Sequence, residues 1–241
     1  MISAWLELAR AHAALLALIV PSFGAVLAVA SPNARLSWLV AALAALVGAA
    51  LAADFAWRTL LGGGFTLAHE VIPLRLDGVG VWTAALMASM GALVVLAAGA
   101  SLARDFGPRA APYAMALVMV MIAGWSGAAL ARDLIGLIIG VETAWLASVG
   151  LVALSGDRER GALTGALRML TGGGVAGVLM LLGAGLTIFA IGGADLGALA
   201  DGPIALPGLA ATGLGLIFSA LALKAGVAPL HLWVGGAYGR V

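Results

Sequence analysis

The chain has 241 residues, of which 63% are hydrophobic and 10% are charged, and its net charge is +1. Soluble domains carry about 25% charged residues, so this composition excludes an ordinary soluble fold and predicts a polytopic membrane protein in the lipid bilayer. The small net charge argues against nucleic acid as a partner. Cysteine is absent, which excludes disulfides and thiolate metal sites; no metal or cofactor site is predicted.

Seven apolar stretches are long enough to cross a hydrocarbon core about 30 Å thick. They do not alternate apolar and polar residues, so membrane helices are predicted and barrel strands are not. The first stretch is interpreted as a retained span and not as a signal peptide. The predicted spans are Ala13–Ala30, Leu36–Ala53, Val79–Leu102, Ala111–Leu130, Leu134–Leu154, Met169–Ile191 and Ile204–Ala228.

The positive charges predict the orientation of these spans. Cytoplasmic loops of membrane proteins carry an excess of Lys and Arg. The excess lies on the side of the loop that follows the first span, which predicts an N-terminus outside the cell and a cytoplasmic C-terminus. The outer side carries Arg10, Arg58, Arg75 and Arg132, and the cytoplasmic side carries Arg35, Arg104, Arg109, Arg158, Arg160, Arg168 and Arg240.

Two pairs of glycines indicate close helix packing. Gly136 and Gly140 lie just before Glu142, and Gly173 and Gly177 follow the start of the sixth span. Small residues four apart let helix backbones approach closely in lipid, where the hydrophobic effect does not drive association.

Two charged residues lie inside the predicted spans. Glu142 is in the middle of Leu134–Leu154, and Lys224, the only lysine of the chain, is late in Ile204–Ala228. A charge at the bilayer centre costs about 2.5 to 3.5 kcal/mol on insertion scales. Burial disfavours the charged form of each group and mutual approach favours it, so a change in their separation would switch their affinity for protons. A proton relay is therefore the leading prediction, without evidence from the sequence that the two helices touch.

Each of these two charges also has a structural explanation. Lys224 precedes Pro229 by about 8 Å of helix, so its stem could snorkel to the membrane surface. Glu142 is too deep to do so and would instead be a paired structural carboxylate.

Four further residues are candidates to support the relay. Pro229 is predicted to break the last helix and to free carbonyl groups for water or an ion. His231 is of the residue type that titrates near neutral pH, and could link the lysine to bulk water or lie at the interface. Arg168 is a supporting cation or an interfacial anchor, and Asp77 is an entry-side charge or a helix cap.

Three stretches carry a resemblance to a known family. DLIGLIIGVETAWLASVGLVAL, followed by GDRERGALTGALRML and ALALKAGVAPLHLW, resembles the antiporter-like proton-channel family. Respiratory complex I, membrane-bound hydrogenases and Mrp-type cation/proton antiporters share this family. Within it, AHAALLALIVPSFGAVLAVASPNARLSW and LRLDGVG look most like the Mrp-type antiporters.

The resemblance implies the N-terminal half of an all-α antiporter-like fold with a broken seventh helix. Residues 1–110 would be three N-terminal spans, and residues 111–241 an incomplete repeat of four. Glu142 falls on the family's ion-pair glutamate, Lys224 on its central lysine, and His231 on the histidine of the Pro-x-His-x-Trp motif. Arg168 falls on a basic position at the start of the sixth span.

Two departures from the family pattern are visible. Val234, Gly235 and Gly236 follow the motif, where relatives continue with Leu-Pro and a polar residue. Relatives also have about fourteen spans in two inverted repeats. The chain is therefore expected to be a piece of a longer subunit or a half-length member completed by another polypeptide.

Three functions are compatible with these features. The leading prediction is a proton-translocating subunit of a multi-subunit monovalent cation/proton antiporter in the bacterial inner membrane, with Na⁺ or K⁺ as the candidate exchanged ion. The alternative is the same module in a redox-driven complex, where partner subunits would supply the redox centres. The third is a membrane scaffold, which gains nothing from charges in lipid.

Overall fold

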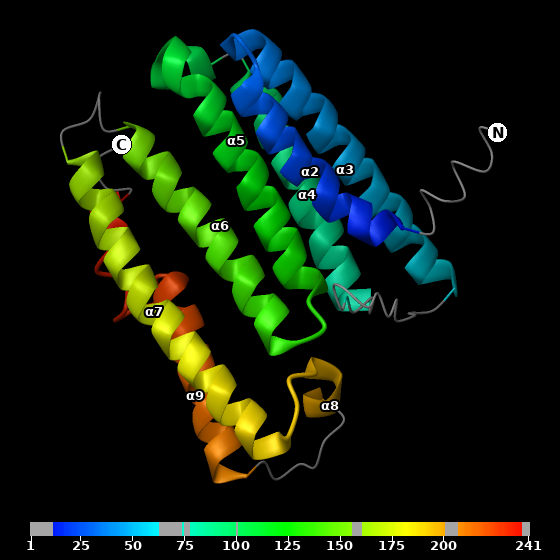
Figure 1. Cartoon of the computed structure of the whole chain (residues 1–241), viewed down its shortest axis with the longest axis vertical. Helices are drawn as coiled ribbons and strands as arrows, with labels where there is room; N and C mark the ends of the chain where they lie inside the picture. Colours follow the sequence, from blue (N-terminus) through cyan, green and yellow to red (C-terminus); the bar gives the residue numbers. More distant parts are fainter. Residues whose placement is uncertain are drawn as a thin grey trace. The chain divides into compact units, whose positions relative to one another are not determined.

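The computed structural model describes residues 12–62, 74, 78–99, 101–155, 161–200 and 207–237. Among these residues every regular element is a helix, which confirms the predicted all-α class (Figure 1). The contacts divide the chain into two compact units, Met1–Ala131 and Arg132–Val241. The division predicted from the sequence, between residues 110 and 111, falls inside the helix that ends the first unit.

Each of the seven predicted spans overlaps a helix. Five of these helices, α3 to α7, are long and apolar enough to cross a membrane, whereas α2 and α9 are shorter apolar helices. The helices are α2 (Ala13–Ala30), α3 (Ala34–Gly62), α4 (Gly78–Ala98), α5 (Leu102–Leu130), α6 (Leu134–Leu154), α7 (Ala162–Ile191), α8 (Leu196–Ala200), α9 (Gly208–Lys224) and α10 (Val234–Ala237).

Several helices extend beyond the apolar stretches from which they were predicted. α5 begins at Leu102 instead of Ala111, and α7 begins at Ala162 instead of Met169. Charged residues at these ends delimit the apolar surface, but the helix continues because its backbone groups still bond to one another. In α5 the helix is kinked at Gly107, whose φ of 79° only glycine adopts readily, just before Pro108.

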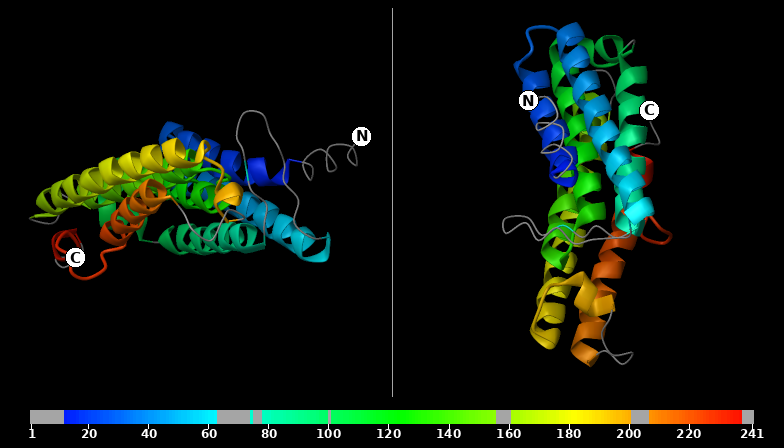
Figure 2. Two further views of the ribbon diagram at one scale, coloured as in Figure 1. Left: turned by 90° about the horizontal axis from the view of Figure 1, so that it is seen from below. Right: turned by 90° about the vertical axis from the view of Figure 1, so that its right-hand side faces the viewer.

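The first unit is a bundle of α2, α3, α4 and α5, in which successive helices run in opposite directions (Figures 1 and 2). Trp38 of α3 links α3 to α4. Its indole N–H donates to the carbonyl of Val95 in α4 at 2.9 Å, and its ring lies where a side chain on Gly99 would be. Close packing of this kind replaces the hydrophobic effect as the force that joins helices in lipid.

The second unit is organised around α7. α6, α9 and α10 all pack on α7, and α9 lies alongside it in both views of Figure 2. Gly183 of α7 and Gly213 of α9 meet at the crossing, where a Cβ on either residue would strike the backbone carbonyl of the other. The two backbones are therefore in contact at this point.

Two backbone hydrogen bonds and one ion pair join the loop before α6 to the loop before α8. The backbone N–H of Leu134 donates to the carbonyl of Ala194 at 3.0 Å, and that of Leu196 donates to the carbonyl of Arg132 at 2.9 Å. Arg132 also pairs with the carboxylate of Asp195 at 2.7 Å, with both side chains more than a third exposed. Both residues lie on the side that the charge distribution predicts to be outside the cell.

The last predicted span ends earlier than expected. α9 stops at Lys224, residues 225–233 are not helical, and the short α10 follows. Pro229 explains the position of this end, because its ring would clash with the carbonyl of Ala225 if the helix continued. Gly226, with a φ of 66°, then turns the chain away. The predicted break in the seventh span is thus confirmed.

The contact between Gly183 and Gly213 yields a test of this packing. G183L should destabilise the protein by about 1 to 3 kcal/mol, because the new side chain must force α7 and α9 apart. G185L is the matched control, since Gly185 is exposed and nothing lies within 4 Å of the position of its Cβ. Thermal unfolding of the detergent-solubilised protein measures the difference, and equal midpoints for the two variants would contradict the packing.

Candidate functional site

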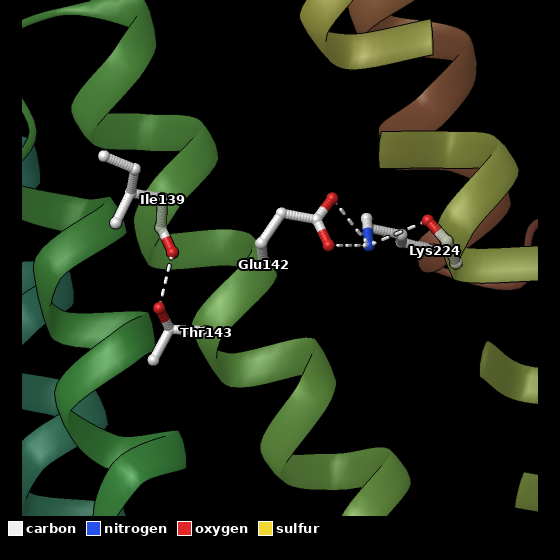
Figure 3. Close-up of polar contacts among 5 residues, drawn as sticks. Ile139, Glu142, Thr143 and Lys224 are labelled. Atoms are coloured by element: carbon white, nitrogen blue, oxygen red, sulfur yellow. Dashed lines mark hydrogen bonds and ion pairs between the residues drawn. The ribbon is translucent and has the colours of Figure 1, made fainter. Parts of the chain in front are cut away.

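The two intramembrane charges form an ion pair in the second unit. Lys224 Nζ lies 3.1 Å from each carboxylate oxygen of Glu142, and it is 3.4 Å from the carbonyl oxygen of Gly173. Figure 3 shows the two side chains reaching toward each other from α6 and α9. The residues are 82 positions apart in the sequence, so the pair exists only because both helices pack on α7.

The pair is unequally buried. The Lys224 side chain is 4% exposed and that of Glu142 is 28% exposed. The lysine therefore does not snorkel to the surface. The pairing of Glu142 fits both a structural carboxylate and a proton relay. An ammonium in such surroundings is stable only when paired and hydrogen-bonded, and Glu142 and the Gly173 carbonyl provide both.

Two glycines of α7 make room for the site. A Cβ on Gly177 would lie 2.8 Å from a carboxylate oxygen of Glu142, and a Cβ on Gly173 would collide with the indole nitrogen of Trp145. Glu142 and Trp145 are three residues apart on α6 and so lie on one face of that helix. The predicted small-residue pair is thus part of the site: it lets these two side chains lie against the backbone of α7.

Two tryptophans lie next to the ion pair. The Trp145 ring centroid is 4.5 Å from Lys224 Nζ, and the rings of Trp145 and Trp233 meet edge to face with centroids 4.7 Å apart. Trp233 is fixed by its own N–H, which donates to the carbonyl of Leu223 at 2.8 Å. The ammonium therefore faces a carboxylate, a carbonyl and an aromatic ring.

The sequence analysis did not identify Trp145 as a site residue. The available signal was its spacing of three residues from Glu142, which places both on one helical face. That spacing alone does not say which neighbour the ring contacts, and an aromatic residue in an apolar helix is usually ordinary packing.

Three carbonyl groups in the last turn of α9 accept hydrogen bonds from residues that follow the helix. The carbonyl of Leu221 accepts from Ala225, that of Ala222 from Val227, and that of Leu223 from Gly226 and Trp233. The turn satisfies these three groups because the chain bends back onto the end of the helix. That Pro229 frees other carbonyls for water or an ion stays a prediction.

The supporting residues are placed apart from the ion pair. Arg168 is an exposed residue of α7 and, with Pro229 and Trp233, lines a groove of about 430 Å³. His231 is exposed in the turn between α9 and α10, where its carbonyl accepts from Val234. Neither side chain is among the groups that contact the Lys224 ammonium. Asp77 lies outside the described residues.

The chain is similar in sequence to proteins of known family. Residues 131–240 match the family described as NADH:quinone oxidoreductase/Mrp antiporter, transmembrane. The NADH-quinone oxidoreductase subunit N of Rubrobacter xylanophilus is 31% identical over 82% of this chain and 41% of its own length. That of Syntrophotalea carbinolica is 33% identical over 90% of this chain and 45% of its length. The chain thus spans less than half the length of these curated relatives.

Solved structures share the fold at lower identity. The Mrp complex from Dietzia sp. matches with a TM-score of 0.76 and 23% identity, over 96% of this chain and 44% of the matched chain. An archaeal membrane-bound sulfane sulfur reductase matches with a TM-score of 0.75 and 21% identity, over 96% and 48%. Respiratory complex I from Thermus thermophilus matches with a TM-score of 0.71 and 24% identity, over 93% and 47%.

The energetic coupling of the ion pair can be measured with a double-mutant cycle. E142Q should destabilise the protein by about 3 to 5 kcal/mol, because it leaves the ammonium buried without its counter-charge. The double variant E142Q/K224Q removes both charges and should recover much of that loss. Thermal unfolding in detergent provides the four values of the cycle. Additive effects of the two single substitutions would mean that the pair contributes no coupling.

The role of Gly173 can be tested by adding one methyl group. G173A should displace Trp145 and destabilise the protein by about 1 to 3 kcal/mol, since a well-packed ring has no space to retreat. G174A is the control, because nothing lies within 4 Å of its Cβ position and alanine favours a helix over glycine. The same unfolding measurement applies, and a G173A protein as stable as G174A would contradict the close approach of Trp145 to α7.

Proposed function

We propose that this chain forms part of a proton-translocating membrane subunit, because residues 131–240 match the NADH:quinone oxidoreductase/Mrp antiporter transmembrane family. The observation that carries the proposal is the contact between Glu142 and Lys224, two opposite charges held 3.1 Å apart inside a bundle of apolar helices. Their cost in the membrane favours a functional role over a scaffold, which would be more stable with apolar residues at both positions.

The proposed mechanism depends on the distance between the two groups. When they are in contact, each stabilises the charged form of the other, and the pair holds one proton on the amine. When they separate, each group is left in apolar surroundings, where the neutral form is favoured. Lys224 then gives up its proton and Glu142 can take one. Repeated closing and opening of the pair would move protons, provided that the donor and acceptor sides are reached in alternate states.

The supporting residues have a place in this mechanism. His231 is exposed at the end of the segment that follows Lys224, and it is proposed to pass protons between the lysine and bulk water. Arg168, which borders the groove between α7 and that segment, is proposed to set the positive potential there. Asp77 is still proposed as either an entry-side charge or a helix cap.

We infer further that electron transfer, and not cation exchange, drives the protein. The curated relatives at 31% and 33% identity are named as subunits of NADH-quinone oxidoreductase. The similarity to the Mrp complex, at 23% identity, is an argument about the fold alone. The redox-driven alternative is therefore better supported than the Mrp-type cation/proton antiporter. Partner membrane subunits and a place in the bacterial inner membrane belong to the same proposal.

The experiment that tests this function measures proton translocation by the assembled complex in membrane vesicles. E142Q and K224Q should each abolish the pH gradient formed during quinone reduction, because each removes one of the two proton-binding groups. D54N is the matched control: the same carboxylate-to-amide change in α3, at a residue paired with Arg58 outside the site. Full translocation by both site variants, at normal levels of the complex, would reject the relay.

The same vesicles distinguish the two sources of energy. With NADH as electron donor, the redox-driven proposal expects a pH gradient that does not depend on added Na⁺ or K⁺. A gradient that forms without an electron donor and collapses on adding one of these cations would instead favour the antiporter.

A further inference from the structure

Trp145 lies beside the ion pair in a way that ordinary packing does not explain. Its side chain is almost completely buried, with 5% of the residue exposed, and its ring lies 4.5 Å from the Lys224 ammonium. The face of an indole ring carries partial negative charge and attracts a cation, most strongly where water is excluded. The ring thus provides the ammonium with a third attractive partner besides Glu142 and the Gly173 carbonyl.

The indole N–H of Trp145 is not the reason for this placement. It is buried and has no hydrogen-bond acceptor among the described residues. A buried donor without an acceptor is unfavourable. The place of the Trp145 side chain is therefore maintained by contacts of its ring, and its N–H opposes that placement. Trp233 differs in this respect, because its N–H is bonded to Leu223.

The neighbours of Trp145 hold the ring in one orientation. Gly173 presses against the nitrogen edge of the ring, and Trp233 packs against it edge to face at 4.7 Å. Trp233 is itself fixed to the carbonyl of the residue before Lys224. The ring is therefore packed on these sides with its face toward the ammonium.

We infer that Trp145 is a positioning residue of the ion pair: its ring face holds the Lys224 ammonium against Glu142. This inference rests on the proposed function for its meaning in proton transfer, but the interaction itself can be tested without transport. The prediction is that, among variants of similar size at position 145, one with an aromatic face holds the ammonium better than one without, and that the indole N–H is not required.

The structure provides a matched pair of variants for this test. W145F keeps an aromatic face and loses no hydrogen bond, because the indole N–H makes none with the described residues. W145L is similar in volume to phenylalanine and equally apolar, but has no ring. Alanine is unsuitable, since it would also leave a large cavity in place of the ring. W145M is a second ringless variant, in case the branched leucine does not fit.

The first measurement is the thermal unfolding of the assembled complex, made with and without the lysine charge. W145L should unfold about 2 to 4 °C below W145F, which corresponds to the loss of a buried cation–ring contact. In a K224Q background the two variants should unfold at the same temperature, because there is no ammonium to hold. If W145L unfolds below W145F by the same amount with Lys224 and with K224Q, the difference comes from packing alone, and the inference is overturned.

The second measurement is proton translocation per electron transferred in the same complexes. W145L should translocate about three- to thirtyfold more slowly than W145F, because only phenylalanine keeps an aromatic face toward the ammonium. If E142Q and K224Q also leave translocation intact, the proposed function fails while the unfolding result still decides the role of Trp145. If those two variants abolish translocation but W145F and W145L behave alike in both assays, the function stands and the inference fails.

Discussion

The second unit depends on one interaction, the contact of a buried ammonium with a carboxylate across the backbone of α7. Lys224 is surrounded by apolar helices in which an isolated charge is strongly disfavoured. Glu142, the carbonyl of Gly173 and the ring of Trp145 together replace the water that the ammonium has lost. Each contact is ordinary by itself. Their convergence makes the charged state of the pair depend on how three helices are packed.

The backbone of α7 links this chemistry to the packing of the bundle. α6 carries the carboxylate and α9 carries the amine, and both pack on α7. Glycines let each of them approach closely, at Gly173 and Gly177 on the α6 side and at Gly183 on the α9 side. Because these contacts are close, a shift of either helix along α7 changes the distance between the two charges directly. The small residues therefore hold the helices together and, under the proposed function, set the separation of the two charges.

The sequence predicted the existence of the elements better than their ends. Each of the seven apolar stretches predicted from the sequence overlaps a helix, and five of these helices are long enough to cross a membrane, because satisfying the backbone in lipid requires helices of a definite length. The starts of α5 and α7 were misplaced, since charges near a membrane surface do not interrupt a helix. The cost of burying a charge also singled out Glu142 and Lys224. That argument concerns single residues and cannot say which helices are neighbours.

The part of the site that the sequence missed is the part made by tertiary packing. Trp145 has no signature of its own, and its importance comes from Gly173 and Lys224, which are distant in sequence. The partners of the last carbonyls of α9 could not be predicted for a related reason. Proline predicts where a helix must stop, but the partners of the last carbonyls depend on the path of the chain beyond it.

That path holds the end of α9 in place. Three carbonyls of its last turn are bonded to residues 225–227 and to Trp233. Lys224 is the final helical residue, where the negative end of the helix dipole favours a cation. Trp233 connects the non-helical segment to the ring that faces this cation. A displacement of that segment would therefore pass through two rings in contact to the ammonium, and the ion pair would respond to a change made outside the helices that carry it.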